Sequence, residues 1–129
     1  MGGGIYKSAP MEIWAAKVLV AGAADTVSAA FQLTLGGGTL LLKLVNGATG
    51  PTVAAEIQPQ ASTAASGKEW FDLTTPEGAA TKLTGGTAAN EAKSRTVEVP
   101  QGVLYLRLVA GKNTVQNVAA HAALVENHR

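Results

Sequence analysis

The stretch TLLLKLVNG, residues 39–47, determines the fold class of this chain. Its even-numbered leucines are separated by single residues; they are Leu40, Leu42 and Leu44. A period of two is typical of a β-strand with one buried face, because successive side chains point to opposite sides of a sheet. We therefore predict a strand whose three even-numbered leucines face the core, with Leu41 and Lys43 facing outward.

The same alternation recurs on both sides of this stretch. FQLTL (31–35) leads into Gly36–Gly38, and three glycines allow a tight turn, so we predict a β-hairpin between 31–35 and 39–45. TVAAEIQPQAS (52–62) alternates again. Pro59 cannot donate a hydrogen bond to a neighbouring strand, which predicts a sheet edge or the end of pairing there.

Further strands are predicted in the second half of the chain, at EWFDL (69–73), RTVEVP (95–100), VLYLRLVAG (103–111) and TVQNVAAHAALVE (114–126). The polar, glycine-rich connection 74–93 is long, with room for one short strand near 81–83, and is predicted to carry a contact. About eight or nine short strands separated by turn signals predict an all-β fold, a single antiparallel β-sandwich or jelly roll.

A length of 129 residues predicts one domain. Residues 1–11 (MGGGIYKSAPM) have no period, and we predict an N-terminal arm there, followed by a β-sandwich domain over 12–129. Ile5 and Tyr6 would lie on a neighbouring surface; the alternative is a disordered tail. The apolar stretch 12–24 is interrupted by Glu12 and Lys17, so we do not expect it to act as an export signal.

The composition argues against several classes of partner. Ten Lys and Arg balance nine Asp and Glu, for a net charge of +1, whereas nucleic-acid binding favours a clustered basic surface. The sequence has no apolar run of the ~18 residues that a membrane helix needs. It has no Cys, which excludes disulfides and thiolate metal sites. We expect no nucleic-acid or membrane partner.

No catalytic arrangement is recognisable in the sequence. His121 is the one plausible general base, and nothing marks a nucleophile or an orienting group beside it. The carboxylates are dispersed and lack the spacing of a metal-binding loop. We therefore expect no enzymatic activity, no cofactor and no metal.

The aromatic pair Trp70–Phe71 allows two interpretations. Alternation places the two side chains on opposite faces of a strand. We predict that Trp70 anchors the core, so that Trp70→Ala unfolds the domain, and that Phe71 contacts a partner. Tyr105 and Arg107 alternate with core leucines and are further candidates for partner contact. The alternative is a sugar-stacking surface built from Trp14, Trp70, Phe71 and Tyr105.

The order of several segments resembles that of small β-sandwich virion structural proteins of tailed bacteriophages. The segments are NGATGPTV (46–53), AAEIQPQAS (54–62), EWFDL (69–73) and GVLYLRLVAGKNTVQNVAAHAALVE (102–126). Arg107, Gly111, Asn113 and Thr114 match the late strand and turn of that family. The chain departs from the family at Ser66, where the family has Asp before the glycine.

This resemblance implies a capsid decoration, or cement, protein located on the virion surface. Its partners would be the major capsid protein and copies of itself, as a dimer or trimer. The contacts would involve the arm residues Ile5 and Tyr6 together with Phe71, Tyr105 and Arg107. The alternative function is a carbohydrate- or receptor-binding β-sandwich module associated with a tail or fibre.

Overall fold

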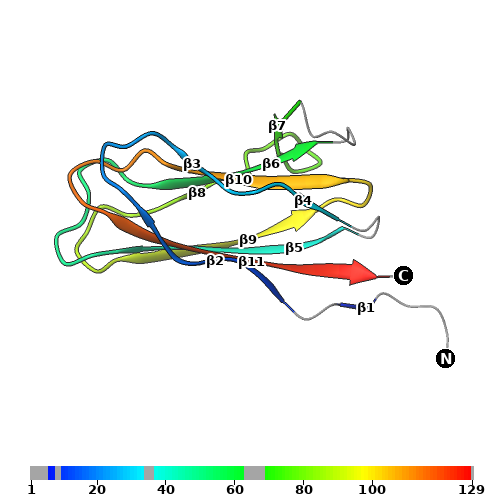
Figure 1. Cartoon of the computed structure of the whole chain (residues 1–129), viewed down its shortest axis with the longest axis horizontal. Helices are drawn as coiled ribbons and strands as arrows, with labels where there is room; N and C mark the ends of the chain where they lie inside the picture. Colours follow the sequence, from blue (N-terminus) through cyan, green and yellow to red (C-terminus); the bar gives the residue numbers. More distant parts are fainter. Residues whose placement is uncertain (1–5, 8–9, 34–36, 63–68, 129) are drawn as a thin grey trace.

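Two antiparallel β-sheets lie face to face in the computed structural model (Figure 1). The structure describes residues 6–7, 10–33, 37–62 and 69–128. Its strands are β1 (Tyr6–Lys7), β2 (Met11–Leu19), β3 (Thr26–Val27), β4 (Phe31–Gln32), β5 (Gly38–Asn46), β6 (Glu56–Ser62), β7 (Phe71–Asp72), β8 (Leu83–Thr84), β9 (Ala92–Val99), β10 (Tyr105–Gly111) and β11 (Val118–His128). The predicted all-β sandwich is confirmed.

The first sheet has β11 and β5 at its centre. Its order is β1-β11-β5-β9, and β2 also pairs with β11. The predicted faces of β5 are confirmed, since its even-numbered leucines are buried while Leu41 and Lys43 are exposed. β11 is a strand as predicted, and its core side chains are Val118, Ala120, Ala122 and Leu124.

The second sheet is built around β10 and β6. β3 and β4 pair with one side of β10, while β7 and β8 pair with opposite ends of β6. Pro59 lies between the segments of β6 that pair with β8 and β7. Its carbonyl accepts from the Leu73 amide, so its nitrogen faces the same side, away from β10. The missing donor therefore falls where neither short strand pairs, so β6 has a local edge on that side. The other alternative, an end of pairing at Pro59, is wrong, because β6 stays paired with β10 through Pro59 to Ser62.

The predicted hairpin between residues 31–35 and 39–45 is wrong. β4 pairs with β10 in the second sheet, whereas β5 pairs with β11 and β9 in the first. The chain thus crosses between sheets here, and it crosses again between β10 and β11. Glycines permit a hairpin turn but also permit a crossing, and the alternation on each side is the same in both cases.

The predicted N-terminal arm is partly a strand of the sandwich. Tyr6 and Lys7 of β1 pair with His128 and Asn127 at the end of β11. Backbone that precedes the predicted start of the domain at residue 12 therefore already belongs to the first sheet. Ile5 lies outside the described residues.

One edge of the first sheet is protected by an inward-facing cation. Arg95 of β9 is the register partner of Leu42, so its side chain starts on the core side. Its guanidinium donates to the carbonyls of Lys82 (2.9 Å) and Ala80 (3.2 Å), which joins the edge to the loop beside β8. Charged side chains pointing inward at an edge discourage further strands from adding.

Within the residues that the structure describes, no helix is long and apolar enough to span a membrane.

Candidate functional site

The outer face of the second sheet carries a hollow of about 270 Å³. Its lining is mainly polar and comes from β6, β7, β10 and the ends of neighbouring loops: Asp25, Glu56, Gln58, Gln60, Asp72, Lys82, Val109, Ala110, Gly111 and Lys112. We call these residues the polar hollow.

Strand alternation directs the central side chains of the polar hollow outward. Ile57 and Pro59 of β6 are buried, so Gln58 and Gln60 between and after them face away from the core. On β10 the register partner of Gln60 is Arg107, which lies between two buried leucines. The amides and the guanidinium therefore share one face.

These outward side chains form a continuous hydrogen-bonded row. The Arg107 Nε donates to the Gln60 Oε1 at 2.9 Å. The Gln60 Nε2 donates to the Asp72 Oδ1 at 3.0 Å, from the adjacent strand β7. Each side chain is held by the next, so the row is organised before any ligand arrives, which lowers the entropic cost of binding.

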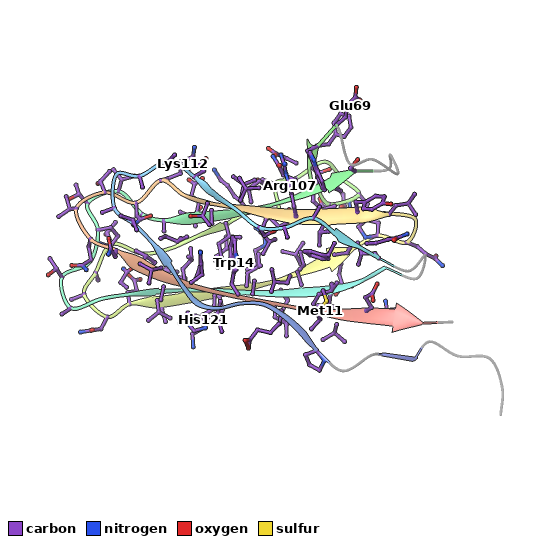
Figure 2. The ribbon with its side chains drawn as sticks, in the orientation of Figure 1. Met11, Trp14, Glu69, Arg107, Lys112 and His121 are labelled. Atoms are coloured by element: carbon purple, nitrogen blue, oxygen red, sulfur yellow. The ribbon has the colours of Figure 1, made fainter. Side chains whose placement is uncertain are left out.

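Trp70 extends this row and does not anchor the core, which corrects the sequence-based prediction. Its ring lies 4.5 Å from the Arg107 guanidinium carbon, measured to the ring centroid, a cation–π distance. The side chain is half-buried and is not part of the core cluster. Figure 2 shows Arg107 on the outer side of the second sheet, whereas Trp14 lies between the sheets and fills the core.

Two ion pairs bound the other end of the polar hollow. The Lys112 ammonium donates to the Asp25 Oδ2 at 3.0 Å, and the Lys82 ammonium lies 3.4 Å from the Glu56 carboxylate. The hydrogen bond to Asp25, reinforced by the charge of that carboxylate, raises the pKa of Lys112 above its usual 10.5. The ammonium is therefore charged throughout the neutral range.

The charges of this face cancel. Its cations are Arg107, Lys82 and Lys112, and its anions are Asp25, Glu56 and Asp72. Three positive and three negative charges leave no net charge, while carboxylates, ammonium groups and amides offer both acceptors and donors. Such a surface suits an uncharged ligand with many hydroxyl groups and does not favour a polyanion.

Gly111 allows the chain to pass close to Asp25, and we expect Gly111→Ala to destabilise the fold. Its φ is +150°, and an added Cβ would lie 2.9 Å from the Asp25 Oδ1. We expect a loss of about 1–3 kcal/mol in the free energy of unfolding, measured by urea denaturation. Gly102→Ala is the control for backbone strain. Gly102 also has a positive φ, +96°, but it has open space around it, so its added Cβ meets no neighbour. An equal loss in both variants would contradict a clash at Asp25.

The structure separates the remaining predicted contact residues. Tyr105 is half-buried and is a register partner of Ser62 and of Gln32, at the opposite end of β10 from Lys112. Phe71 is 63% exposed. The backbone of Tyr6 belongs to β1, away from the polar hollow.

His121 lies on the first sheet, whereas the polar hollow lies on the second sheet. Its Nδ1 accepts from the Ala16 amide at 3.3 Å, which tethers the irregular part of β2, where Ala16 has a φ of +50°. Among the described residues, no cluster of three His, Asp or Glu side chains could hold a metal ion.

Sequence reasoning missed most of the polar hollow. The alternation of β6 gave a signal for Gln58 and Gln60, because both fall between core positions. Asp25 and Lys112 are 87 positions apart in sequence, and Arg107 and Gln60 are 47 apart. Only the order of strands in the sheet brings these pairs together.

No protein-family model and no curated protein matches the chain. Among solved structures, it is similar to the K3 cleaved adhesin domain of Lys-gingipain from Porphyromonas gingivalis W83, with 19% identity, a TM-score of 0.46 and coverage of 79% of this chain. The chain spans 63% of that domain's length.

Two further solved structures show similarity of the same order. A family 16 carbohydrate-binding module has 10% identity and a TM-score of 0.45, with coverage of 87% of this chain and 74% of the module. The K1 cleaved adhesin domain of the same gingipain has 15% identity and a TM-score of 0.46, with coverage of 93% and 73%. Similarity at this level carries no inference about a ligand.

Proposed function

We propose that this chain is a carbohydrate-binding β-sandwich module that holds an uncharged oligosaccharide in the polar hollow. The observation that supports the proposal is the organised row Trp70–Arg107–Gln60–Asp72 on an outer sheet face. Sugars present hydroxyl groups that donate and accept, together with apolar ring faces. The row offers partners for both properties.

The charge balance supports an uncharged ligand over a charged one. With three cations and three anions, the face has no excess charge to attract a phosphate or sulfate polymer. Each ion pair is also internally satisfied, so hydroxyl groups can bind to the unused acceptor and donor positions without removing a charge from its partner.

The shape supports binding along the sheet. The hollow is bounded at one end by the Lys112–Asp25 pair, and the row leads from Gln60 toward Trp70. If one sugar ring lies in the hollow, the adjacent sugar units of the oligosaccharide are directed along this row. Trp70 is held on one side by the guanidinium and remains partly exposed for stacking.

The test is binding by the isolated chain to a glycan array, followed by calorimetric titration with the best-bound neutral oligosaccharide. We expect Trp70→Ala to weaken binding at least tenfold, about 1.4 kcal/mol, without loss of the fold. Phe71→Ala is the matched control, since it removes an adjacent, 63% exposed aromatic outside the row, and should bind normally. Equal weakening in both variants, or no bound glycan at all, would reject the proposal.

The virion role remains a prediction drawn from the sequence resemblance alone. Neither the described residues nor the structural similarities bear on a capsid location or a capsid partner. Quantitative mass spectrometry of gradient-purified particles would test it: hundreds of copies of this chain per particle would support a decoration role, and its absence from particles would reject it.

A further inference from the structure

Four charged side chains stand at one end of the polar hollow, and they come from strands that lie side by side in the second sheet. Asp25 directly precedes β3, Lys112 directly follows β10, Glu56 begins β6 and Lys82 directly precedes β8. All four line the hollow, and we call them the end row. Figure 2 shows Lys112 and Arg107 on the outer side of this sheet, at different positions along the strands.

The backbone places the end row in one line across the strands. Glu56 is the register partner of Gly111. A Cβ added to Gly111 would lie 3.3 Å from the Asp25 Cα, so Asp25 borders Gly111 on the side of β3. Gly111 has no side chain of its own, and the Lys112 ammonium, from the next residue, donates to the Asp25 Oδ2 at 3.0 Å.

The signs of the charges alternate along the end row. Its order across the sheet is Asp25, Lys112, Glu56 and Lys82, and the Lys82 ammonium lies 3.4 Å from the Glu56 carboxylate. The hydrogen bond to Asp25 raises the pKa of Lys112, and the charge of Glu56 adds to this rise, as expected when the two ion pairs are neighbours. A network of several charges keeps its geometry better than one isolated exposed pair.

The hollow beside the end row has a partly apolar floor. The next outward-facing register partners are Gln58 and Val109, and Gln60 and Arg107 follow them. Successive outward pairs are about 7 Å apart, at two residues of strand rise. A sugar ring can lie on the half-buried Val109, with the two glutamine amides beside its hydroxyl groups. The volume of about 270 Å³ is below the ~300–1,000 Å³ typical of drug-sized ligands, which suits a single sugar unit.

We propose that the polar hollow binds the terminal unit of an uncharged oligosaccharide and not an internal segment. This inference rests on the proposed function. An oligosaccharide that lies along the strands over Trp70 and Arg107 meets the end row, which stands across its path. A course across the strands is closed by Lys82 on the side of β8.

The chemistry of the end row also favours a chain end. A terminal sugar unit carries a hydroxyl group where an internal unit carries the glycosidic bond to its neighbour. The ammonium groups of the end row can donate to this hydroxyl group and the carboxylates can accept from it. A further sugar unit at the same place would have to separate charges that are already paired.

The number of protein molecules bound per sugar chain tests this inference. The probes are cello-, laminari-, malto- and manno-oligosaccharides of two to six units, with linear polymer fractions of the best-bound series, titrated calorimetrically with the full chain. We expect one protein molecule per sugar chain at every length. A number that rises with length would overturn the inference and leave sugar binding intact. Binding to none of the four series would also overturn it, and the glycan array then decides whether sugar binding itself fails.

Reduction of the probe to its alditol identifies the end that is bound, because it opens the ring of the reducing end alone. Given one protein molecule per chain, loss of binding assigns the reducing end to the hollow, and unchanged binding assigns the opposite end.

Removal of one ion pair should open the hollow. The double variant Asp25→Ser with Lys112→Ser keeps the net charge, and loss of an exposed pair costs little stability. We expect it to bind short oligosaccharides more weakly and to place more than one protein molecule on each long polymer chain. Glu12→Ser with Lys43→Ser is the matched control, since it removes two exposed, opposite charges from the first sheet, and should still give one. One protein molecule per chain in the Asp25 and Lys112 variant would show that the end row does not close the hollow, and would overturn the inference.

Discussion

Leu42→Ala is expected to lower the free energy of unfolding by about 3–4 kcal/mol, because truncating a buried leucine removes apolar burial and leaves a cavity. Leu42 is 2% exposed at the centre of β5, between β11 and β9. For a domain of this size the loss corresponds to a fall in melting temperature of roughly 10 °C. Urea and thermal unfolding by circular dichroism measure both quantities.

Leu41→Ala is the matched control, since it makes the same truncation at the next residue on the opposite side of the strand. We expect a loss of under about 0.5 kcal/mol, typical of a surface position. Both variants are measured at the same protein concentration. A larger loss at Leu41 than at Leu42 would mean that the faces of β5 are reversed, which a one-residue shift in register would produce.

This pair of variants also shows which part of the fold is predictable from sequence. The alternation of β5 identifies its core leucines because burial on one face requires a period of two, whatever strand lies alongside. The same argument placed Leu106 and Leu108 inside, with Arg107 between them facing outward. Local periodicity therefore determines which way a side chain faces.

Periodicity does not determine which strands are neighbours. The three glycines at 36–38 were compatible with a hairpin, yet β4 and β5 belong to different sheets. Pairing depends on contacts between distant segments, such as β5 with β11. The local edge at Pro59 was predictable because a missing donor is a property of one residue. The continued pairing with β10, and the identity of β7 and β8 on either side of Pro59, were not.

The aromatic pair shows the same limit at the candidate site. Alternation correctly separated Trp70 from Phe71, but it could not decide which of them is covered. Trp70 is covered by Arg107, which comes from β10, 37 positions later in the chain (107 minus 70). A large aromatic residue was assigned to the core because its partner on the outer face could not be identified from local sequence.

Arg107→Met is expected to have the largest effect on sugar binding, a loss of about 100-fold, or ~2.7 kcal/mol, by calorimetric titration. The guanidinium both stacks on Trp70 and donates to Gln60. Its removal releases the ring from its position and leaves the Gln60 oxygen without this donor. It also gives the outer face, counted as the polar hollow together with residue 107, a net charge of −1. The side chain is half-buried on the outer face, so we expect little change in stability.

Arg107→Lys tests whether sugar binding depends on the positive charge at residue 107 or on the planar shape of the guanidinium. Lysine restores the neutral balance of the polar hollow and residue 107 taken together, but it lacks the planar guanidinium that stacks on Trp70 while donating to Gln60. We therefore expect Arg107→Lys to recover only a small part of the lost affinity. Full recovery would show that the charge alone matters and that Trp70 does not need to be held. Unchanged binding in Arg107→Met would place the ligand elsewhere on the molecule, and the polar hollow would lose its proposed role.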